Sequence, residues 1–454
     1  MLLLDENHNA TPLHTVTASE LVAFLQNTDE TTRNWLNATS FTAAPYTFAV
    51  VPDASGRVAA VVVGVKSATD IFALAHLPSA LPNGTYKLAT SQAIGDYACA
   101  LSWLLGTYQF SRYKASPKPM SRLSMASSVA TIRAQQMFDA IALTRDLVNT
   151  PTEDMGPQHL SQVARQLANE FDGTFREIVG DDLLTENFPA IHAVGRASHR
   201  PPRLIEITWG DPSHPRVAVV GKGVCFDTGG LNIKGADGMR QMKKDMGGGA
   251  HALALARLIM QSKLPVLLHM LVPAVENAIA GNAYRPGEIV STRAGLKIEI
   301  GNTDAEGRVV LSDALALAAE SKPELIIDFA TLTGAARVAL GPELPATFAN
   351  DDAWFNALQA AATAAQDPIW RMPLWQPYHD MIKSSIGDIV NTGGPQAGAV
   401  TAALFLERFI PQGQAWIHID TFSWNLKPRP GRPDGGEAQS LRACFEMLKT
   451  KFAR

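Results

Sequence analysis

Charged side chains that are able to bind a cation or transfer a proton interrupt apolar segments in the second half of the chain. Lys222, Asp227 and Lys234 occur in VVGKGVCFDTGGLNIK, where an apolar run leads into a glycine-rich turn. Asp245 precedes three glycines in MKKDMGGGAHAL, where the small residues let the backbone pack closely before a helical pattern begins. Taken singly, each acid is more often a helix cap or a member of a surface ion pair.

A further pair of carboxylates, Asp304 and Glu306, lies two residues apart in GNTDAEGRVVL, with Arg308 two further along. This spacing turns both carboxylates to one side of an extended segment. If they meet Asp227 and Asp245 at one edge of a sheet, like charges about 4 Å apart repel by on the order of 4 kcal/mol per pair at an effective dielectric of 20. Two divalent metals would neutralise such a cluster, activate a water and polarise a substrate carbonyl. Oxygen ligands suit manganese and magnesium, and zinc also accepts carboxylates, so the metal identity stays open.

The elements that must position these residues follow an α/β pattern. Continuous apolar runs occur in RLIEITW, RVAVVGKGVCFD, PVLLHMLVPAV, ELIIDFATL and AWIHIDTF, and they alternate with helical patterns near 239–260, 308–320, 354–365 and 398–409. Continuous rather than alternating apolar strands are typical of a mostly parallel sheet that is covered on both faces by helices. Ligands of such sheets bind at the carboxyl ends of the strands, where the charged residues occur.

The N-terminal part of the chain reads as a separate domain. The segment 47–66 alternates like a hairpin of two strands, and 111–128 concentrates Ser, Pro and basic residues as a linker does. A helical pattern then ends just before Pro151. We therefore predict a smaller N-terminal α/β domain over 1–125, a connecting helix over 126–150, and a larger C-terminal catalytic α/β domain over 151–454 with a mixed, mostly parallel sheet flanked by helices.

Composition and charge exclude several classes of protein. Hydrophobic residues make up 46% of the chain and charged residues 18%, which indicates a globular rather than a disordered chain. The 39 basic and 43 acidic side chains give a net charge of −4, so no global basic field attracts nucleic acid or anionic lipid. No apolar stretch reaches the roughly 18 residues of a membrane span, and no secretory leader is visible. We expect a cytoplasmic protein.

Familiar sites of other kinds are missing from the sequence. The three cysteines, Cys99, Cys225 and Cys444, are far apart and form no CxxC pair, which argues against a disulfide framework and a zinc-thiolate site. The chain also lacks HExxH, a GxSxG elbow, a GxxxxGK[ST] loop and a strand-to-helix GxGxxG.

The run GNTDAEGRVVL resembles the signature of the leucyl aminopeptidase family, the M17-type cytosol aminopeptidases, which are two-metal exopeptidases. The resemblance extends at the family's spacing through LLGTYQFSRYK, RDLVNTP, GKGVCFDTGGLNIK and MKKDMGGGAHAL, and covers the chain from about residue 100 to its end. Many relatives have serine at the position of Thr228. The threonine retains the hydroxyl group. The resemblance implies release of N-terminal amino acids from peptides, with a leucine-like preference, by a metal-bridging hydroxide, and assembly as a homohexamer.

The resemblance also implies a set of metal ligands, which hold two divalent ions per chain, Mn²⁺ or Zn²⁺. One ion would be bound by Asp227, Asp304 and Glu306, and the other by Lys222, Asp227, Asp245 and Glu306. Asp227 and Glu306 would bridge the two ions. A lysine coordinates only as a neutral amine, and a neighbouring dication favours the loss of its proton.

Further roles follow from the same resemblance. Lys234 would donate a hydrogen bond to the developing oxyanion, and Arg308 would hold a bicarbonate ion that shuttles a proton. Met242, Thr331 and Gly334 match positions around the pocket for the substrate side chain, with 397–401 completing its wall.

Two other functions stay open from the sequence. The first is a dipeptidase or amidase with a narrow substrate, such as a Cys-Gly peptide-turnover enzyme, which a comparison of aminoacyl amides with dipeptides would distinguish. The second is a DNA-binding regulator with incidental peptidase activity. The net charge of −4 and the lack of a long basic run weigh against nucleic acid as a partner.

Overall fold

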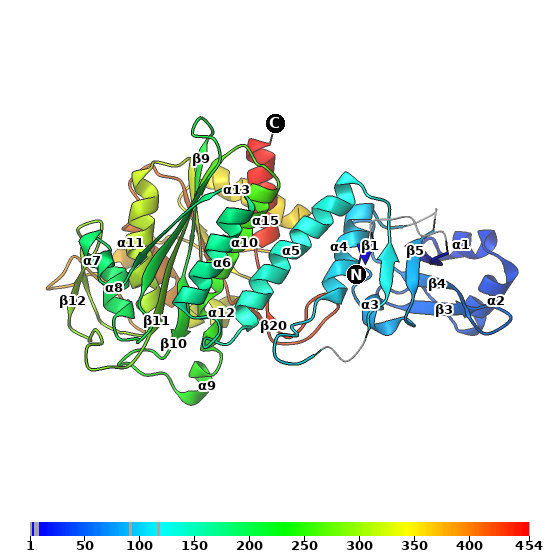
Figure 1. The fold of residues 1–454 in the computed structure, drawn as a ribbon, viewed down its shortest axis with the longest axis horizontal. Helices are drawn as coiled ribbons and strands as arrows, with labels where there is room; N and C mark the ends of the chain where they lie inside the picture. Colours follow the sequence, from blue (N-terminus) through cyan, green and yellow to red (C-terminus); the bar gives the residue numbers. More distant parts are fainter. Residues whose placement is uncertain (1, 4–8, 90–92, 116–118, 454) are drawn as a thin grey trace. The chain divides into compact units, whose positions relative to one another are not determined.

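The computed structural model describes residues 2–3, 9–89, 93–115 and 119–453. Within these residues the chain forms two compact units (Figure 1). The first unit comprises 1–142 together with the short segment 427–434, and the second comprises 143–426 and 435–454. Among the described residues, no helix combines the length and the apolar character that crossing a bilayer requires.

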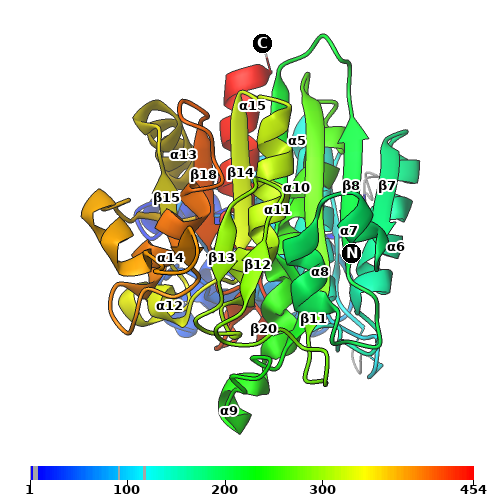
Figure 2. The ribbon, with the colours of Figure 1, turned by 90° about the vertical axis from the view of Figure 1, so that its left-hand side faces the viewer.

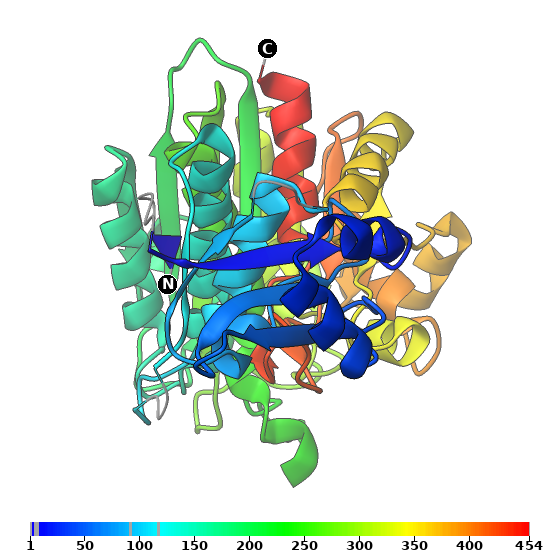
Figure 3. The same ribbon diagram turned by 90° about the vertical axis from the view of Figure 1, so that its right-hand side faces the viewer.

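The first unit is built around a six-stranded sheet in the order β1-β6-β5-β2-β4-β3 (Figure 3, blue to cyan). Its strands are β1 (Leu2–Leu3), β2 (Thr11–Val16), β3 (Phe48–Pro52), β4 (Val58–Gly64), β5 (Thr85–Leu88) and β6 (Arg122–Ser124). Its helices are α1 (Leu21–Asn27), α2 (Glu30–Ala38), α3 (Leu77–Ala80) and α4 (Asp96–Thr107), while α5 (Val129–Asn149) contains residues of both units. All neighbouring strands are parallel except β3 and β4, which form the antiparallel hairpin predicted from the alternating segment.

The second unit contains a mixed sheet in the order β16-β15-β18-β14-β9-β11-β8-β7, with β10 also paired to β11. The strands are β7 (Thr174–Val179), β8 (Arg203–Trp209), β9 (Arg216–Gly221), β10 (Gly223–Asp227), β11 (Leu267–Asn277), β14 (Leu325–Ala330), β15 (Ala346–Ala349), β16 (Trp370–Arg371) and β18 (Trp416–Asp420). The central strands β18, β14, β9 and β11 are mutually parallel, so their carboxyl ends lie at one edge. Antiparallel pairs occur toward both sides of the sheet.

Helices cover both faces of this sheet (Figures 1 and 2). One face carries α8 (Pro189–Gly195), α11 (Glu306–Glu320) and α14 (Gly398–Glu407), and the other carries α6 (Pro157–Glu170), α10 (Gly247–Gln261) and α15 (Leu441–Phe452). Val220 and Ile326 of the strands pack in one buried cluster with Leu311 of α11 and Phe405 of α14. Two α/β units, the larger with a mixed sheet flanked by helices, confirm the fold class predicted from the sequence.

Smaller elements complete the second unit. A three-stranded sheet is formed by β12 (Ile289–Ser291), β13 (Lys297–Glu299) and β17 (Ile389–Val390), and a two-stranded one by β19 (Trp424–Asn425) and β20 (Gly435–Gly436). The remaining helices are α7 (Asp182–Thr185), α9 (Ala236–Met239), α12 (Gly334–Leu340) and α13 (Asp352–Ala364), with the 3₁₀ helices η1 (Met242–Met246) and η2 (Gln376–Ile382).

The start of α10 lies unusually close to the strands, and glycine makes this approach possible. A Cβ atom at Gly248 would lie 2.1 Å from the carbonyl oxygen of Phe329 in β14. A Cβ atom at Gly221, at the end of β9, would lie 2.4 Å from the carbonyl oxygen of Gly248. Because no side chain fits between these backbones, the glycine run after Asp245 places the start of this helix against the carboxyl ends of β9 and β14.

Gly248→Ala should therefore destabilise the second unit although alanine is the better helix former. The new methyl group has to push backbone rather than a flexible side chain, and we expect the free energy of unfolding to fall by about 1–3 kcal/mol. Gly281→Ala is the matched control, because a Cβ there meets no atom within 4 Å. Denaturant unfolding of both variants would contradict this account of α10 if their stabilities were equal.

Candidate active site

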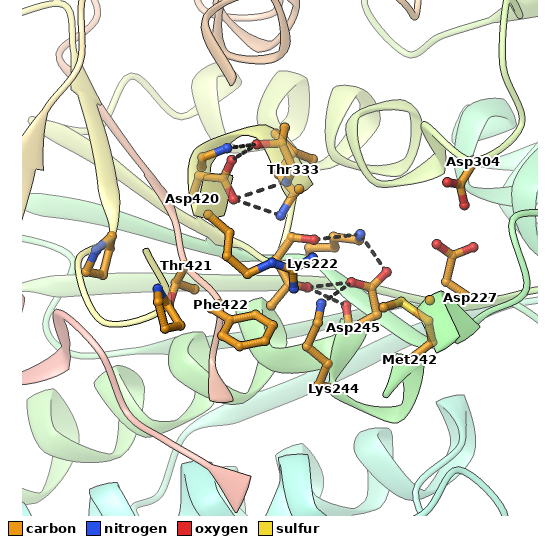
Figure 4. Close-up of a pocket in the computed structure, with 18 of the residues that line it drawn as sticks. Lys222, Asp227, Met242, Lys244, Asp245, Asp304, Thr333, Asp420, Thr421 and Phe422 are labelled. Carbon is orange, nitrogen blue, oxygen red and sulfur yellow. Dashed lines mark hydrogen bonds and ion pairs between the residues drawn. The ribbon is translucent and has the colours of Figure 1, made fainter. Parts of the chain in front are cut away.

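The charged residues singled out in the sequence come from several elements at the carboxyl ends of the central strands. Lys222 lies between β9 and β10, and Asp227 is the last residue of β10. Asp245 belongs to η1, and Glu306 is the first residue of α11. Together with Lys234 and Asp304 they line a cavity of about 420 Å³ in the second unit (Figure 4).

Lys222 lies between two of the acids. Its Nζ is 2.7 Å from Oδ2 of Asp245 and 2.8 Å from Oε1 of Glu306, and it donates a third contact of 3.1 Å to the carbonyl oxygen of Thr331. Only 3% of the Lys222 side chain is exposed. Oxygen atoms of Asp227, Asp245 and Glu306 all lie within 4.8 Å of one another, which makes this group a candidate metal site.

Lys234 joins the other pair of acids. Its Nζ is 2.8 Å from Oδ2 of Asp227 and also forms an ion pair with Asp304. Asp304 is the most exposed of the four acids, with a third of its side chain accessible, whereas Asp227 is buried. The structure thus brings all four predicted carboxylates and both predicted lysines to one cavity.

Burial and mutual repulsion determine how the cluster ionises. Burial, followed by repulsion from Asp227, raises the pKa of Glu306 to about 8 and the pKa of Asp304 to about 6. Burial opposes the charge of Lys222, but Asp245, Glu306 and Asp227 outweigh it and raise the pKa of Lys222 above its usual range. For Asp245, burial is outweighed by two neighbouring lysines, which lower its pKa. Burial and crowding therefore oppose full ionisation of Glu306 and Asp304 unless a further cation is bound.

Backbone and side-chain hydrogen bonds hold Asp227 in place. Its Oδ1 accepts from the backbone N–H of Gly229 and from Nδ2 of Asn277, both at 2.8 Å. Gly229 has a φ of +87°, a left-handed conformation that favours glycine. The hydroxyl of Thr228 donates to the carbonyl oxygen of Asn277 at 2.8 Å, so the threonine at this position retains a hydrogen-bonding role.

Asn277 is a positioning residue that the sequence analysis missed. It ends β11 next to β10, and its Nδ2 also donates to the carbonyl oxygen of Thr303 at 3.0 Å, while Tyr284 donates to the same oxygen at 2.6 Å. These bonds link the strand that carries Asp227 to the loop that carries Asp304. The available signal was a buried apolar strand that ends in a polar amide.

Arg308 lies on α11 but is not among the residues that line the cavity. Its Nη1 donates to the carbonyl oxygen of Asn391 at 2.9 Å, and its buried Nε has no hydrogen-bond partner among the described residues. Burial lowers the pKa of Arg308 to about 10. The guanidinium group therefore retains donor capacity for an anion such as bicarbonate.

The residues predicted to surround a substrate side chain line the same cavity. Met242, Thr331 and Gly334 are all part of its wall, whereas 397–401 are not. Thr331 also donates from Oγ1 to Oδ1 of Asp245 at 2.8 Å. Lys244, which the sequence analysis did not single out, is part of this wall too. Burial lowers the pKa of Lys244, and Asp245 opposes that change.

The donor set fits divalent cations. Four carboxylates and one amine converge, and oxygen-rich ligation of this kind suits manganese, magnesium and zinc. A bound cation would relieve the repulsion that helps to raise the pKa of Glu306 and Asp304. Lys222 would serve as a ligand only as a neutral amine, and a nearby dication penalises its ammonium form.

Two models of protein families match the chain. Residues 142–444 match the model of the cytosol aminopeptidase family catalytic domain, and residues 11–126 match the M17 aminopeptidase N-terminal domain. A probable cytosol aminopeptidase of Roseiflexus castenholzii is 40% identical over 364 residues, which are 76% of this chain and 74% of that protein.

Solved structures are similar over nearly the whole chain. The cytosol aminopeptidase of Coxiella burnetii has a TM-score of 0.95 at 46% identity and covers 99% of both chains. The bottromycin maturation enzyme BotP in complex with Mn has a TM-score of 0.88 at 30% identity and covers 97% of this chain and 99% of BotP. With both domain models matched, the chain belongs to the cytosol aminopeptidase family of M17 peptidases.

Proposed function

We propose that this protein is a metal-dependent exopeptidase that releases N-terminal amino acids, including leucine-like residues, from peptides. The observation that carries the proposal is the buried cluster of Asp227, Asp245 and Glu306 around Lys222, in a cavity that also has an apolar wall. The similarity to BotP, whose structure was determined with Mn, supports a divalent metal at this cluster.

The proposed ligands divide into two sets that share two residues. Lys222 and Asp245 belong to one set, Asp304 belongs to the other, and Asp227 and Glu306 are common to both. When bound, divalent metals polarise a carbonyl and make water a competent nucleophile near neutral pH. The ion pairs of Lys222 with Asp245 and Glu306 keep this side chain next to the carboxylates, and Lys222 has to release its proton to act as a ligand.

Other side chains of the protein have separate tasks in the proposal. Lys234 lies at the edge of the cluster with 15% of its side chain exposed, so it is able to donate a hydrogen bond to a substrate carbonyl oxygen. Arg308 would hold a bicarbonate ion that accepts and returns a proton. Met242, Ala336 and Leu344 supply apolar surface for the side chain of the first residue.

A panel of substrates tests the proposal directly. Protein stripped of metal should hydrolyse leucine 4-nitroanilide only after Mn²⁺, Zn²⁺, Mg²⁺ or Co²⁺ is added, because the proposed reaction needs a metal to activate the attacking water. Longer peptides should lose residues one at a time from the N-terminus, as mass spectrometry would record. Cleavage restricted to dipeptides would instead support a narrow dipeptidase, and no cleavage with any metal would contradict the proposal.

Glu306→Ala should reduce both metal content and activity, because Glu306 is proposed to contact both ions. We expect activity to fall by at least about 100-fold and the bound metal to drop below the wild-type stoichiometry. Elemental analysis after dialysis measures the metal. Glu320→Ala is the matched control, since Glu320 ends the same helix and pairs with Arg293 away from the cavity. Equal metal content in both variants would remove Glu306 from the ligand set.

Lys222→Met and Lys234→Met should have different consequences although both delete an ammonium group. The first removes a proposed ligand and should lower metal occupancy. The second removes a proposed donor to the oxyanion and should lower kcat by about 10²–10³ while metal content and KM change little. Steady-state kinetics and metal analysis of the same preparations would contradict this assignment if Lys234→Met lost metal or kept near-normal kcat.

A further inference from the structure

Lys244 places a buried positive charge on the wall of the cavity. It belongs to η1, and 6% of its side chain is exposed. It lines the cavity together with Met242, Thr331 and Gly334, which are the residues predicted to surround a substrate side chain. Its Nζ lies 3.2 Å from Oδ1 of Asp245 and 5.7 Å from the centre of the Phe422 ring (Figure 4).

The charge of Lys244 is only partly compensated within the protein. Its carboxylate partner, Asp245, is shared with Lys222 at 2.7 Å and accepts from Thr331 at 2.8 Å, and in the proposed function Asp245 binds a metal. A buried ammonium group with a shared partner is unfavourable unless another anion approaches it. A ligand with a negative charge would therefore be stabilised on this part of the wall.

A second cation lies on the same side of the cavity. The guanidinium of Arg337 is 4.4 Å from the centre of the Phe422 ring, so Lys244 and Arg337 share this aromatic neighbour. Among the residues that the structure describes, Arg337 has no carboxylate partner. Asp420 also lines the cavity, but it accepts from the backbone N–H groups of Leu332 and Thr333 and from the Thr333 hydroxyl.

Lys243, the residue before Lys244, points to a different part of the structure and does not line the cavity. The Nζ of Lys243 donates to the carbonyl oxygen of Asn149 at 2.6 Å and lies 5.6 Å from the centre of the Trp424 ring. Lys243 is not among the residues that line the cavity. Of the two consecutive lysines in η1, only Lys244 is therefore placed to meet a bound substrate.

We propose that the cavity favours peptides whose N-terminal residue is acidic, with the side-chain carboxylate of Glu or Asp paired to Lys244. This inference rests on the proposed function, because it assumes that the cavity holds the first residue of a peptide. The methylene groups of a glutamate would contact Met242 and Phe422, while its carboxylate meets the ammonium group. Leucine-like residues use the same apolar surface without the ion pair.

The test compares substrates that differ in charge but not in shape. Wild-type protein loaded with Mn²⁺ is assayed with the 4-nitroanilides of glutamate, glutamine and leucine, alongside Lys244→Met and the matched control Lys243→Met. We expect wild-type protein to prefer glutamate over glutamine by about tenfold or more in kcat/KM, as a charge-assisted contact predicts. Lys244→Met should reduce that ratio by about tenfold to a hundredfold, mainly through KM, whereas Lys243→Met should leave it unchanged.

A binding measurement separates this inference from the proposed function. Calorimetric titration with free L-glutamate and L-glutamine uses the same three proteins and needs no turnover. Tighter binding of glutamate that depends on Lys244 would support the inference even if no anilide were cleaved. The absence of cleavage would contradict only the proposed function. Cleavage of the leucine substrate with equal binding and turnover of glutamate and glutamine would overturn the inference alone.

Metal analysis of Lys244→Met tests whether Lys244 only balances the charge of Asp245 and does not contact the substrate. If Lys244 serves only to balance Asp245, the substitution should lower metal content and reduce the turnover of all three substrates by the same factor. That result would also overturn the inference, because the ratio of glutamate to glutamine would then be independent of Lys244.

Discussion

The repulsion between buried carboxylates is the constraint on which the rest of the site depends. Oxygen atoms of Asp227, Asp245 and Glu306 lie within 4.8 Å of one another, and burial strengthens their repulsion. The ion pairs of Lys222 with Asp245 and Glu306 relieve part of it. Burial, followed by repulsion from Asp227, raises the pKa of Glu306 to about 8, although Lys222 and Lys234 oppose that change. A site of this kind is suited to cations.

Close backbone packing makes this concentration of charge possible. A Cβ atom at Gly307 would lie 2.6 Å from Cε of Lys222, so glycine at the second position of α11 leaves room for the lysine beside Glu306. Gly248 similarly allows α10 to begin against Phe329 of β14, just after the 3₁₀ helix that carries Asp245. Gly248 and Gly307 thus allow α10 and α11 to begin close to the carboxylates of the cluster.

The wall of the cavity combines apolar surface with positive charge. Met242 and Leu344 contribute apolar side chains, while Lys244 and Arg337 both lie near the ring of Phe422. Because the carboxylate cluster lies beside this wall, an acidic ligand has to meet Lys244 without approaching the acids. Bound cations would reduce that repulsion, so metal binding and the acceptance of an acidic residue would support each other.

The sequence alone determined the fold class and the residues around which the site is built, because strand patterns and short motifs are local properties of the chain. The run NTDAEGRV and the apolar strands were enough to propose that Asp304 and Glu306 meet Asp227 and Asp245. Tertiary structure decided which of the consecutive lysines faces the cavity, since the direction of a side chain in a 3₁₀ helix depends on its surroundings. It also decided that Asn277 joins Asp227, 50 residues before it, to Thr303, 26 residues after it. Such contacts follow from long-range packing, which spacing along the chain does not encode.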